Sequence, residues 1–274
     1  MGRALIVPAA GFGTRMASLT GGRAKELLEI GGRPAILWAM EEGAALGAEL
    51  AVVVVRPGKE GIARLLTDLD AYRDAFPGSV ERMVRLRDIL PLYFVNQPAP
   101  RGEADAMLWA AEACPGLPLA VHYPDNVAPR GGALAALAEG AAPEEHVVGL
   151  MDPEGVPGVG DSGRVDLARS EDESRRITRF LPKGRGHFTP RFPGELRTCG
   201  IHLAGPDYPA YLDEAVRRHP EGEVTDSMVR RLMLAAGVTF RARRLPGPVY
   251  DVGTPEGYAA CRAVYAQYRR GKEG

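Results

Sequence analysis

The sequence predicts an α/β protein, with a Rossmann-like, mostly parallel sheet and helices on both faces. Apolar runs of strand length alternate with segments of helical period along the first half of the chain. The runs are continuous, as in residues 50–55, which is typical of strands that helices cover on both sides. With 274 residues, 45% of them hydrophobic, the chain has enough apolar mass for a full core.

The first half of the chain, about residues 1–126, is expected to bind a nucleotide. Ligands of parallel sheets bind beyond the carboxyl ends of the strands, so the loops that follow these strands carry the candidate site. The expected strands are residues 4–7, 50–55, 92–95 and 117–121, and the expected helices are residues 34–45, 61–69 and 103–113.

The second half, about residues 127–274, is expected to be a smaller mixed part that binds the other substrate and ends in a helix. Residues 161–194 are polar and rich in Pro and Gly, which predicts loops, short strands and a flap over a site. No linker divides the chain, so we expect one domain over residues 1–274. Further strands are expected at 146–150, 198–204, 239–245 and 249–250, and helices at 208–218, 225–236 and 255–269.

Composition and charge exclude several classes of partner. The net charge is -1, from 34 Lys and Arg against 35 Asp and Glu, so no positive field favours a nucleic acid polymer. The apolar start breaks at Pro8 and no later run is long enough for a membrane span, so a cytoplasmic protein is expected. Three widely spaced cysteines predict reduced structural thiols, and Trp38 and Trp109 are expected in the core.

The loop after the first strand is the most informative segment. Gly11 and Gly13 let the backbone approach a ligand, while Arg15 and Lys25 supply fixed positive charge, which suits a triphosphate. Met16 stands where a dinucleotide-binding fingerprint has its third glycine, and the P-loop signature is absent from this sequence.

Residues 7–16 together with Lys25-Glu26-Leu27-Leu28 resemble the signature loop of the sugar-phosphate nucleotidyltransferases. The similarity is closest to the bacterial glucose-1-phosphate uridylyltransferases and thymidylyltransferases. It implies that Arg15 and Lys25 are catalytic. It also implies a set of nucleotide-binding residues in the loop, namely Ala9, Ala10, Gly11, Gly13 and Thr14.

Later motifs occur in the order of that family. Gln97 and Gly102 resemble the Gln and Gly that meet the edge of a uracil or thymine base. Asp125, in Tyr123-Pro124-Asp125-Asn126, resembles the catalytic Asp that holds magnesium, and Asp251 resembles the second magnesium ligand. Mg²⁺ prefers one or two carboxylates and completes its shell with phosphate oxygens and water, so the resemblance implies Mg²⁺ as the cofactor.

The expected sugar side of the site departs from the family. Gly200 resembles the glycine that lines the sugar pocket, and Glu223 belongs to a segment similar to the one before the penultimate helix. The family's Glu-Lys-Pro is replaced by residues 180–183, so Lys183 or Arg185 is expected to reach the sugar phosphate instead. Ala24 also stands where relatives carry Pro before the lysine.

The resemblance implies a specific reaction. A sugar 1-phosphate, glucose 1-phosphate first among the candidates, attacks the α-phosphorus of UTP or dTTP and gives a nucleoside-diphosphate sugar and pyrophosphate. Cations must offset the repulsion between the two anionic substrates, which is the expected role of Arg15 and Lys25. The partners are then small molecules, and a homo-oligomer is expected because relatives are commonly dimers or tetramers.

Three alternatives stay open. A nicotinamide-dependent oxidoreductase would need an acidic residue at the end of the second strand, where Arg56 stands instead. A regulatory sugar-nucleotide sensor would keep the fold without turnover, and a related enzyme would use a different phosphorylated acceptor. For single residues, Asp125 could form only a local turn, Asp251 could act as a helix cap, and Gln97 could be solvated.

Overall fold

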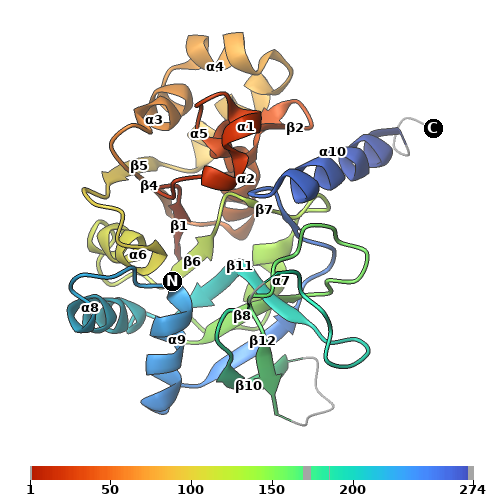
Figure 1. The fold of residues 1–274 in the computed structure, drawn as a ribbon. Coiled ribbons are helices and arrows are strands. Elements are labelled where there is room, and N and C mark those ends of the chain that lie inside the picture. The colour runs from red at the N-terminus through yellow and green to blue at the C-terminus, as the bar shows by residue number, and fades with distance from the viewer. Residues whose placement is uncertain (1, 169–173, 185, 271–274) are drawn as a thin grey trace.

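The computed structural model describes residues 2–168, 174–184 and 186–270, and in these residues nine strands form one large sheet (Figure 1). The strand order is β5-β4-β1-β6-β11-β8-β12-β10-β9. The strands are β1 (Ala4–Pro8), β4 (Leu50–Val55), β5 (Leu92–Asn96), β6 (Leu119–His122), β8 (His146–Met151), β9 (Val165–Leu167), β10 (Ser174–Phe180), β11 (Arg197–Ala204) and β12 (Phe240–Arg244).

The sheet is parallel in its first half and mixed in its second. Strands β5, β4, β1 and β6 run in one direction. Strand β11 is antiparallel to both of its neighbours, β6 and β8, whereas β12 runs parallel to β8. The predicted α/β fold, with a parallel first half and a smaller mixed part, is confirmed.

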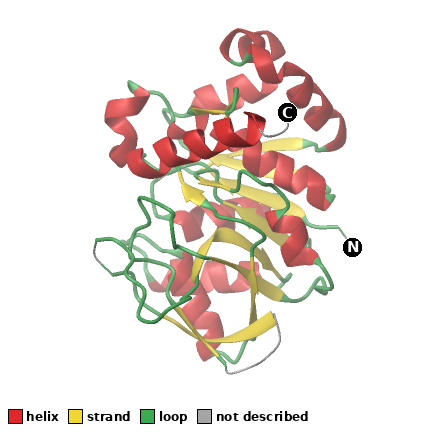
Figure 2. Cartoon of the chain, turned by 90° about the vertical axis from the view of Figure 1, so that its right-hand side faces the viewer, coloured by secondary structure: helices red, strands yellow, loops and turns green. Residues whose placement is uncertain are grey.

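Helices cover both faces of the sheet (Figure 2). Leu5 and Val7 of β1 face the layer that holds α2, α3, α4, α5 and α7, whereas Ala4 and Ile6 face α6, α8 and α9. This alternation explains why the strand is apolar at every position. The α-helices are α1 (Ala17–Thr20), α2 (Ala35–Leu46), α3 (Glu60–Thr67), α4 (Leu69–Ala75), α5 (Val80–Ile89), α6 (Glu103–Glu112), α7 (Ala133–Ala138), α8 (Tyr208–Arg218), α9 (Asp226–Ala235) and α10 (Pro255–Arg270).

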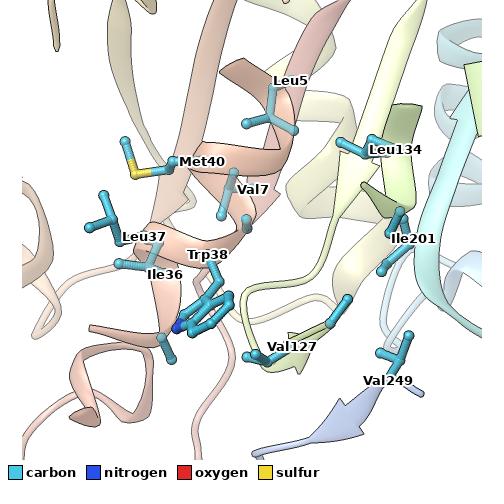
Figure 3. Close-up of a cluster of buried hydrophobic side chains, with 14 of the residues drawn as sticks. Leu5, Val7, Ile36, Leu37, Trp38, Met40, Val127, Leu134, Ile201 and Val249 are labelled. Atoms are coloured by element: carbon cyan, nitrogen blue, oxygen red, sulfur yellow. The ribbon is translucent and has the colours of Figure 1, made fainter. Parts of the chain in front are cut away.

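The larger buried cluster joins the first half of the chain to the second. Leu5 and Trp38 lie in the same cluster as Ile201 and Val249, which come from far along the sequence (Figure 3). Trp38 is buried, as predicted. Trp109 is 38% exposed, so its predicted place in the core is wrong. Helix α6 packs through other positions, including Met107, and leaves Trp109 outside.

The region between β4 and β5 holds more helix than the sequence predicted. Helix α3 ends at Thr67, and Asp68 begins α4 by accepting hydrogen bonds from the backbone N–H groups of Asp70 and Ala71 at 3.0 Å. A side-chain oxygen that satisfies the first free N–H groups is the usual signal for a helix start. Helices α4 and α5 were not predicted because their sequences are rich in charge.

Two short strand pairs complete the fold near the expected site. Strand β13 (Tyr250–Asp251) pairs antiparallel with β7 (Asn126–Val127), and β2 (Glu29–Ile30) pairs with β3 (Arg33–Pro34). The C-terminal helix α10 contacts β13 and lies beside β2, as Figure 1 shows for β2. In the described ranges no helix is long and apolar enough to cross a membrane, and the three cysteines are buried and unpaired.

Candidate active site

A pocket of about 230 Å³ lies beyond the carboxyl ends of β1 and β6. Seven of the predicted nucleotide, catalytic and sugar residues line it. Two larger cavities, beside β9 and β10 and beside α2, contain none of the predicted site residues. The predicted residues that line the pocket are Ala10, Gly11, Lys25, Gln97, Gly102, Asp125 and Glu223.

The glycine loop leaves β1 directly at the pocket. Ala9 continues the strand, since its N–H donates to the carbonyl of Val54 at 2.8 Å. Gly13 has a φ of 69°, a left-handed conformation that glycine adopts without the strain of a side chain. Thr14 then opens a short 3₁₀ turn. Gly13 and Thr14 therefore flank the pocket instead of lining it.

Lys25 forms the central ion pair of the site. It begins the 3₁₀ turn Lys25–Leu27, and its ammonium group donates to Oδ2 of Asp125. Burial acts to lower the pKa of Lys25, but the charges of Asp125 and Glu26 outweigh burial and hold that pKa above its ordinary value. Lys25 is therefore a fixed cation at neutral pH.

Strands β7 and β13 bring the two predicted magnesium ligands together. Asp251 pairs with Asn126, the residue after Asp125, and the N–H of Val252 donates to the carbonyl of Asp125 at 2.8 Å. A Cβ atom on Gly253 would lie 2.9 Å from Asp125 Oδ2, 2.9 Å from Asp251 Oδ1 and 3.2 Å from Lys25 Nζ. The position beside the Gly253 backbone therefore lies close to both carboxylates and to the ammonium group.

The two carboxylates have opposite pKa shifts. Burial acts to raise the pKa of Asp125, but the ion pair with Lys25 holds it below its usual range. Burial, followed by the negative charge of Asp125, raises the pKa of Asp251. Arg15 Nη1 lies 3.7 Å from Asp251 Oδ2, and the Arg15 side chain is 62% exposed. Arg15 therefore sits at the rim of the same charge cluster.

This cluster suits a divalent cation that keeps open positions for substrate. In the part of the chain that the structure describes, no group of three or more His, Cys, Asp or Glu side chains could hold a metal. Asp125 and Asp251 supply two convergent carboxylates, and Gly253 lacks the side chain that would come into close contact with both of them. Two carboxylates are the donor set that Mg²⁺ uses when substrate phosphates and waters complete its shell.

Residues 97–102, the base loop, contain the predicted base-binding residues. This loop is held in place by a contact with the second half of the chain. Gly102 has a φ of 95°, and a Cβ atom there would lie 2.5 Å from the carbonyl oxygen of Val224. The Val224 carbonyl accepts from Ala104 N–H at 3.0 Å, and Val224 N–H donates to the carbonyl of Arg101 at 2.8 Å. Glu223, which was predicted on the sugar side, consequently lines the pocket beside Gly102.

The predicted sugar residues lie apart from one another. Gly200 donates its N–H to Asn126 Oδ1 at 3.2 Å, and a Cβ atom there would overlap the ring of Tyr123. Gly200 therefore contacts the loop that carries Asp125. Lys183 is exposed in the loop after β10 and does not line the pocket. Arg185 lies outside the described residues.

A buried ion pair that the sequence did not predict ties the site together. Lys59 Nζ donates to both Glu26 carboxylate oxygens at 2.9 Å and to the carbonyl of Ala9 at 2.8 Å. Lys59 is 5% exposed and Glu26 is 1% exposed. The sequence signal was a lysine in the loop after the second strand, where a parallel sheet collects functional residues. Glu103 and Tyr123 also line the pocket without having been predicted.

Comparisons with known proteins show which family the chain resembles. Residues 4–184, about two thirds of the chain, match the family described as "Nucleotidyl transferase". A UTP–glucose-1-phosphate uridylyltransferase of Bacillus subtilis is 24% identical over 96% of this chain and 91% of its own length. The corresponding protein of Haemophilus ducreyi is 25% identical over 96% of this chain and 92% of its own length.

Solved structures share the fold. A UDP-glucose pyrophosphorylase in complex with UDP-glucose superimposes with a TM-score of 0.80 at 21% identity, over 98% of this chain and 100% of its own. A UTP-bound UGPase from Acinetobacter baumannii gives a TM-score of 0.73 at 21% identity, over 97% and 93% of the two chains. The family match and these folds lead to one conclusion: the chain belongs to the nucleotidyl transferase family.

Proposed function

We propose that this protein transfers the uridylyl group of UTP to a sugar 1-phosphate, with glucose 1-phosphate as the first candidate, and releases pyrophosphate. The observation that carries the proposal is the convergence of Lys25, Asp125 and Asp251 around Gly253 at the pocket. The uridylyltransferases that align with nearly the whole chain support the choice of substrates.

Charge stabilisation is the main task of the protein groups in this reaction. The phosphate oxygen of the sugar attacks the α-phosphorus in line with the leaving pyrophosphate, so negative charge accumulates between two anions. The ammonium of Lys25 carries three N–H bonds, of which one is directed at Asp125, and the others are available to the α-phosphoryl oxygens. Arg15, exposed at the rim, would neutralise the leaving pyrophosphate.

Asp125 and Asp251 would hold Mg²⁺ between them. When bound, the ion supplies positive charge to the phosphoryl oxygens and relieves the repulsion between the two carboxylates. Removing the divalent cation with a chelator should therefore abolish turnover.

The two halves of the domain would divide the substrates. We propose that residues 1–126, with Ala9, Ala10, Gly11, Gly13, Thr14, Gln97 and Gly102, bind the nucleotide. Residues 127–274 would bind the sugar phosphate, with Gly200 beside the reaction centre and Lys183 reaching inward when the sugar is bound. Glu223 lies at the boundary, next to the base loop. A homo-oligomer and a cytoplasmic location stay predictions of the sequence.

Pyrophosphate release from the purified protein tests the proposal. The assay combines magnesium, one of UTP, dTTP, CTP, GTP or ATP, and one member of a panel of sugar 1-phosphates. We expect release that needs both substrates, is greatest with UTP, and is lost in Asp125→Asn. Release with no sugar, or nucleotide binding without any release across the panel, would contradict the proposal and favour the sensor or an unusual acceptor.

A further inference from the structure

The side-chain amide of Gln97 is held in one orientation. Gln97 is 2% exposed, and its Nε2 donates to the carbonyl oxygen of Gly102 at 3.1 Å and to Oδ2 of Asp105 at 2.7 Å. A backbone carbonyl only accepts hydrogen bonds, and so does an ionised carboxylate. The amide can satisfy both neighbours only with its NH₂ group toward them.

This orientation leaves the side-chain oxygen of Gln97, Oε1, free to accept a hydrogen bond from a ligand in the pocket. Among the described residues, every hydrogen bond of the Gln97 side chain uses Nε2. Oε1 is also not among the enclosed polar atoms that lack a partner, so it retains some open surface. Gln97 lines the pocket with Pro100 and Gly102, at the place expected for the base, and Oε1 is the atom of its amide that no internal hydrogen bond occupies. The site therefore presents a hydrogen-bond acceptor there and no donor from this amide.

Asp105 lies where its carboxylate can hold the Gln97 amide in this orientation. It is the third residue of α6, 5% exposed, in the first turn of the helix. An acidic side chain is favoured in the first turn of a helix, so this location suits Asp105. Gln97 follows β5 directly, and the short connection to α6 brings the two side chains together.

We propose that Asp105 is a positioning residue that sets base selectivity by fixing the Gln97 amide. Uracil and thymine carry a hydrogen on N3 and can donate it to Gln97 Oε1. Cytosine has an unprotonated N3, which would face the Gln97 oxygen with no hydrogen between two acceptors. Leaving buried acceptors unpaired is costly, so the fixed amide rejects cytosine more than it attracts uracil. This inference rests on the proposed nucleotidyl transfer.

The test is the substitution Asp105→Asn, which keeps the shape of the side chain. The introduced amide can donate as well as accept, so the Gln97 amide loses the nearer of its two fixed acceptors, the one at 2.7 Å. Turning over to present its NH₂ to the N3 of cytosine then costs only the longer bond to the Gly102 carbonyl, at 3.1 Å. We expect the ratio of kcat/KM for UTP to that for CTP to fall by roughly ten-fold or more. The ratio of UTP to dTTP should stay unchanged, because both bases carry the same N3–H.

A matched control separates selectivity from stability. Glu42 is another buried acid, which accepts from the N–H of Leu134 at 2.9 Å and lies away from the pocket. Glu42→Gln makes the same change of carboxylate to amide and should leave the UTP to CTP ratio as in the wild type. Thermal unfolding of both variants reports on folding, and binding of UTP and CTP with magnesium measures selectivity if turnover is slow.

The outcomes are distinct. If Asp105→Asn lowers kcat/KM for UTP, dTTP and CTP by one common factor, or leaves all three unchanged, the positioning role is wrong while the proposed function stands. If the wild-type protein transfers no nucleotidyl group but Asp105→Asn still shifts binding from UTP toward CTP, the proposed function fails and the positioning role stands.

Discussion

Lys59 connects two parts of the site that are far apart in the sequence. Its ammonium holds the Ala9 carbonyl on one side and the Glu26 carboxylate on the other, and Glu26 is the neighbour of Lys25. Burial lowers the pKa of Lys59, while Glu26 acts to raise it. A buried pair of this kind is weak evidence for stability, but it fixes the geometry of the groups that it joins.

We therefore expect the ion pair of Lys59 and Glu26, taken as a whole, to matter for nucleotide binding more than for stability. Lys59→Met leaves Glu26 buried without a partner and should destabilise the protein by about 3 kcal/mol or more. The double variant Glu26→Met with Lys59→Met should recover most of that loss because both charges are gone. KM for UTP should stay raised in the double variant, since nothing then holds Ala9 against the Lys25 turn.

Denaturant unfolding and steady-state kinetics measure the two effects separately. The matched control is the ion pair between Arg33 and Glu41, at 3.1 Å, which lies outside the pocket. Replacing both of its partners by Met should leave KM for UTP unchanged. Recovery of both stability and KM in the Glu26 and Lys59 double variant would show that the pair has only a structural role.

The sequence predicted some of these residues and not others for a physical reason. Gly11, Arg15 and Lys25 lie within one short segment, so their joint function can be inferred from local spacing. Lys59 acts through contacts with two distant segments, and sequence spacing carries no information about those contacts. Asp105 is similar, because its role depends on the orientation of Gln97.

At the scale of elements, the base loop depends on its contact with the segment before α9. The Gly102 backbone conformation and its closeness to Val224 O leave no space for a side chain. Gly102→Ala should therefore displace the loop and raise KM for UTP roughly ten-fold, with a smaller effect on kcat.

Gly116→Ala is the matched control for this substitution. Gly116 also has a positive φ, 78°, but a Cβ atom there would meet nothing within 4 Å. Gly116→Ala therefore brings the same backbone strain as Gly102→Ala but no close contact with another residue, so KM for UTP should be unaffected. An equal rise of KM in both variants would mean that the contact with Val224 has no special role.

Strand β11 carries a buried histidine that makes stability depend on pH. Burial, followed by the charge of Arg230, lowers the pKa of His202 to about 3. Its Nδ1 lies 2.8 Å from Arg230 Nη2, which can only donate, so the ring is neutral in the folded protein. Below the ordinary histidine pKa the unfolded chain binds a proton that the folded chain does not. Stability is therefore present above about pH 6.5 and is lost as the pH falls toward 3.

His202→Asn should reduce this dependence. The Asn oxygen can still accept from Arg230, but the side chain does not titrate. The slope of the unfolding free energy between pH 6 and pH 4 should fall by about 1.4 kcal/mol per pH unit, measured by denaturant unfolding. Parallel pH profiles for the two proteins would contradict the assignment.

At the scale of the whole molecule, the site lies where the parallel half of the sheet meets the mixed half. Strand β6 leads to Asp125, and its antiparallel neighbour β11 places Gly200 beside Tyr123. The parallel half could be predicted because its strands and helices alternate regularly along the chain. The position of β11 between β6 and β8 could not be predicted, because that pairing joins residues 46 to 85 positions apart. The closeness of Asp125 and Asp251 depends on a similar long-range pairing.

In the proposed reaction the nucleotidyl group, which carries the α-phosphorus, moves from the nucleoside triphosphate to a sugar phosphate. The most direct measurement uses UTP labelled at the α-phosphate, with glucose 1-phosphate and magnesium, and follows the label by chromatography. We expect the label to appear in a nucleoside-diphosphate sugar, the released pyrophosphate to be unlabelled, and transfer to drop about a hundred-fold or more in Lys25→Ala. Label recovered as UMP without sugar, or transfer at the wild-type rate in Lys25→Ala, would contradict the proposed reaction.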